Sequence, residues 1–367
     1  MRLRSENKIL LAGAAIGLVA VGLVKAGNPP NMGYCIACFL RDLTGSLGLH
    51  RAAPVQYLRP EIVGLVLGAF VASLATREFR STGGAAPLAR FLIGMLSMWG
   101  MLVFLGCPLR TLLRLAGGDL NALAGLAGLV AGVGAGTLYL RMGFSLGRSL
   151  PQDRGAGFVF PGLFVVLLPL ALLQPAFLFA SKQGPGSLHA AAWLSLAAGL
   201  LLGALAQRTR LCLAGGLRDF LLFRDTYLLR GFGAIFLAAL VANLALGLFK
   251  PGFANQPVAH TQTLWNFLGM ALAGLGFVLM GGCPLRQLVA AAEGNSDAAA
   301  AVLGMVFGAA LAHNFGLAAG PAGVPPAGRV AVVAGLVVLA GYAAVNVAAA
   351  RAERLRRQTQ SAPGSSG

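Results

Sequence analysis

Cysteines and arginines recur in this chain as two matching sets, about half a chain apart. The first set is Cys35-Ile36-Ala37-Cys38-Phe39-Leu40-Arg41-Asp42, followed by Gly106-Cys107-Pro108-Leu109-Arg110. The second set is Cys212-Leu213-Ala214-Gly215-Gly216-Leu217-Arg218-Asp219, followed by Gly282-Cys283-Pro284-Leu285-Arg286. The offsets, 212 − 35 = 177 and 283 − 107 = 176, predict an internal duplication without insertions. A thiol near a positive charge can act as a thiolate, a redox group or an S–H donor.

The two Gly-Cys-Pro-Leu-Arg elements predict the start of a helix. Proline is favoured at the first helical position, which makes Cys107 and Cys283 the N-cap residues and turns each thiol toward a positive helix end. Arg110 and Arg286 then place a cation in the first turn, where it opposes the helix dipole by roughly 0.3 to 1 kcal/mol. We therefore expect a compensating anion. It is either a passing substrate or a protein carboxylate such as Asp42, Asp219 or Glu293.

The composition is that of a membrane protein. The mean hydropathy is +0.78, and 57% of residues are hydrophobic whereas only 11% are charged. Soluble domains have about a quarter of their residues charged. The chain holds 28 Lys and Arg against 11 Asp and Glu, but no polar domain could carry a basic face. We therefore expect a lipid bilayer as partner and no nucleic acid.

Ten apolar runs are long enough to cross a bilayer, which takes about 20 residues each. They lie near residues 8–26, 60–76, 88–105, 119–140, 157–180, 188–207, 228–249, 262–281, 297–319 and 329–350. Four shorter segments carry the cysteine motifs, near residues 33–43, 107–116, 211–220 and 283–293. Because each lies between two spans and is too short to cross, we predict four re-entrant half-helices.

The arginines predict the orientation of the chain. If the N-terminus is cytoplasmic, most loop arginines fall on the cytoplasmic side, as the positive-inside rule requires. Both termini are then cytoplasmic. Five spans separate equivalent points of the two copies, an odd number, so the copies have opposite orientations. Transporters use such inverted repeats to build a site near the bilayer midplane.

The predicted fold is an all-α integral membrane protein, an inverted-repeat bundle of about ten transmembrane helices with four re-entrant half-helices. We assign residues 1–142 to the first repeat, 143–186 to a linker with one span, and 187–320 to the second, inverted repeat. Residues 321–350 form an additional span, and residues 351–367 a basic, disordered cytoplasmic tail.

Simpler roles for these residues remain open. A membrane cysteine is often a small packing residue, and Arg41 with Asp42, or Arg218 with Asp219, could be a buried structural pair. Intramembrane charges are nevertheless candidates for function. No His and Cys spacing resembles a metal site, and we expect neither a metal nor a cofactor.

The residues around the first cysteine resemble a known family. The relevant segments are Asn28-Pro29-Pro30-Asn31-Met32-Gly33-Tyr34-Cys35 with the residues up to Asp42, Leu49-His50-Arg51-Ala52-Ala53, Arg59-Pro60-Glu61 and both Gly-Cys-Pro-Leu-Arg elements. Together they resemble the YedE branch of the YeeE/YedE sulfur-transport family. The resemblance covers almost the whole chain. It implies a permease of the bacterial inner membrane, shaped like an hourglass, with broken helices meeting at the centre.

The resemblance also implies roles for individual residues. Cys35, Cys107, Cys212 and Cys283 would hand a substrate onward by S–H contacts, whereas Cys38 matches Gly215 and has no thiol counterpart. The implied substrate is a small selenium- or sulfur-containing species, with selenium for the YedE branch and thiosulfate for its relatives. A cytoplasmic TusA-like sulfur-carrier protein is an implied partner.

Two classes of function compete. The first is a transporter, not an enzyme, in which thiols pass the substrate and the arginines Arg41, Arg110, Arg218 and Arg286 support it electrostatically. The second is a membrane thiol oxidoreductase that uses Cys35 and Cys38 as a redox dyad. The duplication favours the transporter, because it keeps a single cysteine with an Arg-Asp pair and loses the second cysteine of the dyad. A channel or a structural membrane protein is a further alternative.

Overall fold

The computed structural model describes residues 2–361, with side chains described for residues 7–353, and it is nearly all-α. Within residues 2–361, ten helices are long and apolar enough to cross a membrane. The main helices of these spans are α1 (Arg2–Lys25), α3 (Pro60–Ala75), α4 (Pro87–Phe104), α6 (Asn121–Arg141), α7 (Arg154–Leu173), α8 (Ala192–Thr209), α10 (Tyr227–Ala245), α11 (Thr263–Met280), α13 (Ser296–Asn314) and α14 (Pro326–Ser361). Three of the spans, Pro87–Ala116, Ala192–Phe223 and Thr263–Ala292, include a following short helix as well. The predicted fold class is confirmed.

The four cysteine motifs lie on short helices, as predicted. These half-helices are α2 (Ile36–Ser46), α5 (Pro108–Ala116), α9 (Leu213–Phe223) and α12 (Pro284–Ala292). The remaining elements are two 3-10 turns, η1 (Ala53–Val55) and η2 (Pro185–Ser187), and two short antiparallel strands, β1 (Thr82–Gly83) and β2 (Leu150–Pro151).

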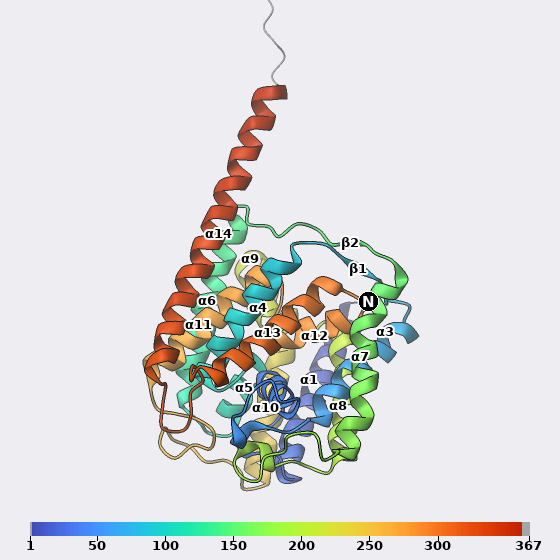
Figure 1. The fold of residues 1–367 in the computed structure, drawn as a ribbon, viewed down its shortest axis with the longest axis vertical. Helices are drawn as coiled ribbons and strands as arrows, with labels where there is room; N and C mark the ends of the chain where they lie inside the picture. The colour runs from blue at the N-terminus through green and yellow to red at the C-terminus, as the bar shows by residue number, and fades with distance from the viewer. Residues whose placement is uncertain (1, 362–367) are drawn as a thin grey trace, which may run out of the picture.

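Two predicted segments need correction. The span predicted over residues 157–180 is too long, because α7 ends at Leu173 and Gln174 turns the chain with a positive φ of 44°. The stretch after residue 350, predicted to be disordered, continues α14 as a helix to Ser361. Figure 1 shows this end of α14 projecting beyond the bundle. Residues 362–367 of the predicted tail lie outside the described residues.

Helices of the two predicted repeats pack against each other as parallel pairs. On α8, Gly199 meets Glu61 of α3, and four residues later Gly203 meets Leu65. A Cβ at Gly203 would come within 2.0 Å of the Leu65 carbonyl oxygen, so only glycine permits this approach. Small residues let membrane helices pack closely in this way. The same four-residue step relates Gly13 and Gly17 of α1 to Gly231 and Ile235 of α10, Gly128 and Gly132 of α6 to Phe267 and Ala271 of α11, and Gly304 and Gly308 of α13 to Phe91 and Met95 of α4.

The helices α4 and α11, which are equivalent in the two repeats, run antiparallel. Gly100 of α4 meets Gly269 of α11, whereas Ser97, nearer the start of α4, meets Gly276, nearer the end of α11. A bundle in which equivalent helices run in opposite directions is an inverted repeat. The helix α14 covers this pair, since it contacts both α4 and α11.

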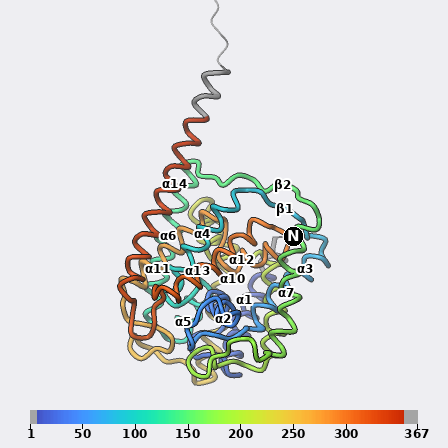
Figure 2. Tube along the Cα trace, in the orientation of Figure 1, coloured from blue at the N-terminus to red at the C-terminus, as the bar shows by residue number. Residues whose placement is uncertain are grey.

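The half-helices α5 and α12 point toward opposite faces of the bundle. We name the side where α1 begins and α14 leaves the bundle the terminal face, and the other side the distal face (Figures 1 and 2). The end of α5 is bonded to the loop after α10, through Lys250 N–H to the Gly117 carbonyl at 2.9 Å. The end of α12 is bonded to the loop after α3, through Arg80 N–H to the Glu293 carbonyl at 2.9 Å. Because α10 ends at the distal face and α3 at the terminal face, the two motifs enter from opposite sides.

The duplication is not free of insertions, contrary to the prediction. The starts of α4 and α11 are offset by 263 − 87 = 176 residues, but those of α3 and α10 by only 227 − 60 = 167. The difference arises because the loop at residues 47–59 is long and its equivalent at 224–226 is short. The distal loops at residues 26–35 and 246–262 are long as well. Long loops therefore cover the distal face and leave the terminal face less covered.

Candidate functional site

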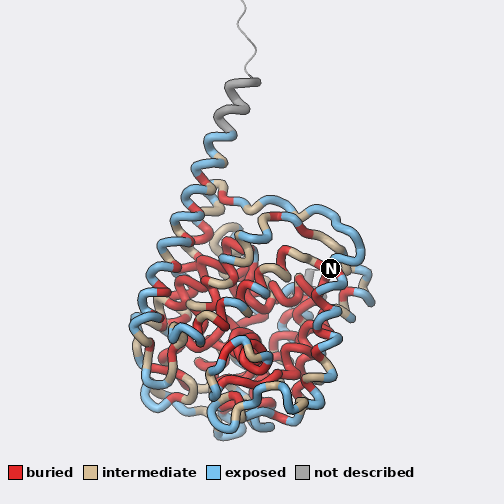
Figure 3. The backbone as a smooth tube through the Cα atoms, viewed as in Figure 1, coloured by how far each residue is buried: buried red, intermediate tan, exposed pale blue. Residues whose placement is uncertain are grey.

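Each of the four half-helices begins at a buried cysteine. Cys35, Cys107, Cys212 and Cys283 are the N-cap residues of α2, α5, α9 and α12, and none has more than 4% of its surface exposed. The N-cap positions of Cys107 and Cys283 confirm the interpretation of the Gly-Cys-Pro-Leu-Arg elements. Figure 3 shows that the centre of the bundle, where these helices start, is buried. All five cysteines are free thiols.

The sulfur atoms of two of these cysteines accept hydrogen bonds from the helices they begin. Cys35 Sγ accepts the N–H of Cys38 at 3.3 Å, and Cys212 Sγ accepts the N–H of Gly215 at 3.2 Å. The bonds are equivalent in the two repeats and use only the backbone of the third residue. This explains how Gly215 can stand where the first copy has Cys38. Cys212 Sγ also accepts the N–H of Cys283 at 3.4 Å, which joins α9 to α12.

A narrow cavity of about 10 Å³ separates the two copies of the motif. Cys107 and Cys283 both border it, and the rest of its wall is apolar. The other lining residues are Ile36, Pro108, Leu109, Leu213, Phe232, Pro284 and Leu285. A space of this size holds about one water, and an apolar wall offers that water no hydrogen-bond partners. The thiols are therefore the main polar groups at the narrowest point.

Asp42, on the distal side of the centre, holds two arginines together. Its Oδ1 accepts Arg41 Nη2 at 2.7 Å, and its Oδ2 accepts Arg59 Nε at 2.9 Å. All three side chains are at most 2% exposed. Arg59 also donates to the carbonyls of Leu188 and Pro185. The pair of Arg41 and Asp42 was one of the interpretations that the sequence left open, and Arg59 ties it to the loop before α8.

Arg110 has a different environment from the one the sequence suggested. Its side chain is fully buried, and it contacts no carboxylate among the described residues. It donates instead to three carbonyl oxygens, those of Asn31 at 2.9 Å, Val258 at 3.0 Å and Leu105. Its Nη1 also donates to Cys38 Sγ at 3.2 Å. A buried cation with no anionic partner is costly, and an anion beside Arg110 would offset that cost.

A second buried arginine follows one turn later on α5. Arg114 donates to Asp119 Oδ2 at 2.7 Å and lies over the ring of Phe104. Asp119 also accepts hydrogen bonds from Asn31 and Asn121. This cluster braces α5 against the distal loops. Neither of its charges recurs in the second copy, where Ala290 and Asn295 stand at the equivalent positions.

On the terminal side, the equivalent charges are partly exposed. Arg286 donates to Glu293 Oε2 at 3.0 Å, so one of the predicted carboxylate partners is observed. Arg218 pairs with Asp219 at 2.8 Å, and their side chains are 31% and 25% exposed. The equivalent pair on the distal side is at most 2% exposed. The central thiols are thus sealed from the distal face and less covered toward the terminal face.

A cavity of about 390 Å³ opens beside Arg286 at the terminal face, and we call it the vestibule. Its lining residues are Glu78, Arg80, Thr82, Arg210, Arg286, Ala290, Glu293 and Asn295. Arg210 bridges Glu78, at 2.7 Å, and Glu293. Arg208 adds a second ion pair to Glu78 at 3.1 Å. The network joins the end of α8, the loop after α3 and the end of α12.

The pKa of Glu78 makes this network sensitive to acid. Burial alone would raise the pKa of Glu78, but the hydrogen bond from Gln207 and the charges of Arg210 and Arg208 lower it below its ordinary value. A lowered pKa contributes stability that is fully present above the ordinary glutamate value of about 4.3 and is lost as the pH falls through the lowered value. We expect Glu78→Gln to lower the thermal unfolding temperature at pH 7. The difference from the unmodified protein should shrink as the pH falls below about 4. Thermal unfolding scans of both proteins across pH would measure this, and a difference independent of pH would contradict it.

Two histidines fasten the distal loops over the site. The Nε2 of His50 lies 3.0 Å from the Arg41 carbonyl, and its Nδ1 accepts the N–H of Ala52. His260 has the same arrangement, with Nε2 2.8 Å from the Val103 carbonyl and Nδ1 accepting from Gln262. In both rings Nδ1 accepts and Nε2 donates. Each loop is thereby held to a helix that positions the central thiols.

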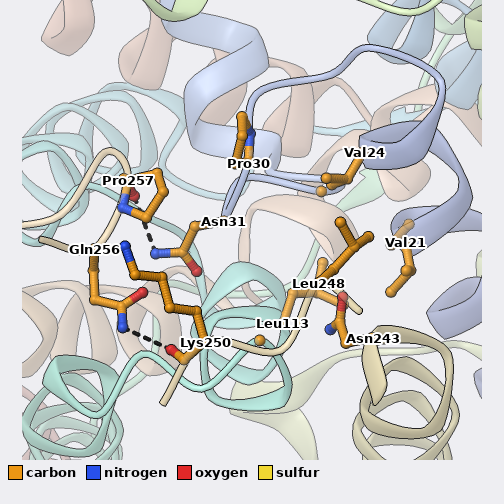
Figure 4. Close-up of a pocket in the computed structure, with 13 residues that line it drawn as sticks. Val21, Val24, Pro30, Asn31, Leu113, Asn243, Leu248, Lys250, Gln256 and Pro257 are labelled. Atoms are coloured by element: carbon orange, nitrogen blue, oxygen red, sulfur yellow. Dashed lines mark hydrogen bonds between the residues drawn. The ribbon is translucent and has the colours of Figure 1, made fainter. Parts of the chain in front are cut away.

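A second pocket, of about 150 Å³, lies at the distal face (Figure 4). It is lined by the end of α1, the loop with Asn31, Leu113 of α5 and the loop from Lys250 to Pro257. Figure 4 shows Asn31 donating to the carbonyl of Pro257. Because the carbonyl of Asn31 accepts from Arg110, one wall of this pocket is bonded directly to the arginine beside Cys38.

Several residues of the site were missed by the sequence analysis. Arg114 lies inside a predicted half-helix, and an ionisable residue inside the membrane is a functional candidate by default, so that signal was available. Glu78 and Arg210 lie in loops, where their charges indicated only topology. No group of three or more possible metal ligands occurs in the described part of the chain.

Comparisons with known proteins match parts of the chain. A family model described as Sulphur transport matches residues 208–365. The Thiosulfate transporter TsuA of Spirochaeta thermophila is 35% identical over 106 residues, which cover 29% of this chain and 32% of that protein. The Thiosulfate transporter TsuA of Escherichia coli K12 is 34% identical over 100 residues, which cover 27% of this chain and 28% of that protein. The chain therefore spans about a third or less of the length of the curated relatives it matches. These matches confirm the resemblance to the sulfur-transport family and give no support to the selenium branch in particular.

Proposed function

We propose that this protein transports a small sulfur- or selenium-containing anion across the membrane along the central thiols. The observation that carries the proposal is the convergence of four half-helix N-termini, each capped by a buried cysteine. Each helix N-terminus carries roughly half a positive charge. Such ends bind anions, and broken helices at the midplane are how transporters expose them.

The chemistry of the narrowest point favours a soft anion. A thiol is a weak S–H donor and a polarisable sulfur atom. A hydroxide, chloride or phosphate ion would need stronger hydrogen bonds than thiols give to replace its water. A species with a terminal sulfur or selenium atom is less strongly hydrated at that atom, so that S–H contacts can replace the lost water. The thiols then act as a filter for soft anions.

The route runs through residues in a fixed order. From the distal face the anion passes Arg110 and Cys38, then Cys35 and Cys107. It crosses the apolar cavity to Cys283 and Cys212, and leaves through the vestibule. Arg41, Asp42, Arg218 and Asp219 support the half-helices on either side. The structure is closed on the distal side, so entry requires the distal loops to move.

We further propose that the terminal face is cytoplasmic and that the membrane is the bacterial inner membrane. The positive-inside rule supports this orientation, since the loop arginines concentrate on the terminal face. A cytoplasmic TusA-like carrier is the proposed acceptor of the transported sulfur. The basic terminal face and its open vestibule would suit such a partner.

Uptake by cells that carry this chain tests the proposed function. We expect uptake of labelled thiosulfate above that of cells without the chain, and selenosulfate, which has a terminal selenium atom, should be tested in parallel for the selenium branch. Competition with unlabelled sulfate measures the soft-anion filter, and we expect sulfate to compete weakly. If neither thiosulfate nor selenosulfate uptake exceeded that of control cells, the proposal would be wrong.

A further inference from the structure

We propose that the vestibule is a binding site for a dianionic tetrahedral oxyanion, held by Arg286, Arg210 and Arg80 in exchange for Glu293. The inference deepens the proposed function, on which it rests, by naming the last binding site of the transported anion. The site lies on the terminal side of Cys283, outside the set of thiols.

The charge of the vestibule is unbalanced. The vestibule and the ion pairs at its edge include four arginines, Arg80, Arg208, Arg210 and Arg286, against the two carboxylates of Glu78 and Glu293. The surplus is 4 − 2 = 2 positive charges. A dianion in the cavity would neutralise it, and the cavity volume of about 390 Å³ is ample for a tetrahedral oxyanion.

Two arginines of the vestibule have guanidinium N–H groups that no carboxylate or carbonyl oxygen of the described residues accepts. The Nη1 of Arg286 is buried and has no hydrogen-bond partner in the described part of the chain. A buried donor left without an acceptor lowers stability, because it has lost its water without gaining a partner. The guanidinium of Arg80 makes no ion pair among the described side chains, although its backbone is bonded to the end of α12. An oxyanion in the vestibule would give Arg286 Nη1 its missing acceptor and would offer the exposed side chain of Arg80 an anionic partner, and guanidinium forks match the geometry of an oxyanion.

Glu293 is the resident anion that the substrate would displace. It is the C-cap residue of α12, where the negative end of the helix dipole disfavours a carboxylate. Arg286 and Arg210 hold it there. A dianion offers the two arginines more charge than one carboxylate. Its arrival would release Glu293 and separate α12 from α8.

The position of Arg286 links this site to the thiols. Arg286 is in the first turn of α12, which begins at Cys283. An anion leaving the thiols of Cys283 and Cys212 therefore meets Arg286 next. The thiols select for a soft atom, whereas the arginines recognise only charge and oxygen atoms. We accordingly expect the vestibule to bind sulfate and thiosulfate alike, although only thiosulfate is proposed to pass the thiols.

Calorimetric titration of the purified full-length protein, in detergent and chloride-free buffer, tests the site. Sodium sulfate and sodium thiosulfate should each bind saturably. Arg286→Gln and Arg80→Gln should weaken binding by about tenfold to a hundredfold, as for the loss of one charge-assisted contact. Glu293→Gln should strengthen it, because the competing carboxylate is gone. Arg148→Gln, at an exposed arginine of the same face outside the vestibule, should bind as the unmodified protein does.

The outcomes separate this inference from the proposed function. Absence of saturable sulfate binding, equal affinity in Arg286→Gln, or weaker binding in Glu293→Gln would each overturn the vestibule site. Uptake of labelled thiosulfate, measured on the same variants, reports on transport alone. Saturable binding with the expected variant effects, but without uptake, would support the site and refute the proposed function.

Discussion

Cys107→Ser and Cys283→Ser should each reduce thiosulfate uptake by at least about tenfold, which corresponds to about 1.4 kcal/mol in the transport barrier. Both thiols border the narrow apolar cavity, where no other polar side chain lines the wall. Serine keeps the size and a donor but loses the polarisable sulfur that a soft anion needs. Initial rates of labelled uptake, divided by the amount of each variant in the membrane, would measure the loss.

We expect both variants to fold, so that a loss of uptake can be assigned to the thiol and not to unfolding. Both cysteines are N-cap residues, and serine is among the best N-caps. We therefore expect thermal unfolding temperatures close to that of the unmodified protein. Cys38→Ser is the matched control, because the second copy has Gly215 at that position and the helix cap uses only its backbone N–H. It should keep more uptake than either N-cap variant.

The same variants separate the two classes of function. An oxidoreductase that used Cys35 and Cys38 as a dyad would need both of these thiols equally and could lose Cys283 without effect. Loss of activity confined to Cys35→Ser and Cys38→Ser would therefore overturn the transporter. Loss at Cys107 and Cys283, on either side of the central cavity, has no explanation in a dyad confined to the first copy.

The sequence predicted the half-helices because their signals are local. Proline after Cys107 and Cys283 fixes the start of each half-helix, and about ten residues cannot cross a bilayer. The helix α7 was predicted too long because the residues after Leu173 remain apolar, while Gln174 ends the helix through backbone geometry. An apolar composition indicates that a segment lies in lipid, but it does not indicate where the helix ends.

The partners of the arginines could not be predicted, because they depend on loops that differ between the two copies. Arg110 and Arg286 occupy equivalent positions in identical five-residue elements. The distal loops bring the carbonyls of Asn31 and Val258 to Arg110, whereas the terminal side brings Glu293 to Arg286. A repeat defines which positions are equivalent, but the insertions decide their environments. The asymmetry of burial between the two faces has the same origin.

Substitution of Arg110 should have the second large effect. Arg110→Gln removes a buried charge that contacts no carboxylate among the described residues, and it leaves up to three carbonyls and Cys38 Sγ without their donor. If that charge attracts the anion, we expect uptake to fall by roughly tenfold to a hundredfold, the equivalent of about 1.5 to 3 kcal/mol for a charged hydrogen bond. Uptake rates per amount of protein, over a range of thiosulfate concentrations, would measure it.

Lysine at the same position distinguishes attraction of an anion from bracing of the loops. Arg110→Lys keeps the charge but cannot donate in several fixed directions at once, so it should retain more uptake than Arg110→Gln while lowering the unfolding temperature. Arg286→Lys should be milder in both respects, because Arg286 is partly exposed and its carboxylate partner can accept from a single ammonium. Equal uptake in Arg110→Gln and the unmodified protein would remove this charge from the mechanism. Equal loss of uptake in the Lys and Gln variants, in step with lost thermal stability, would make Arg110 a brace for the distal loops.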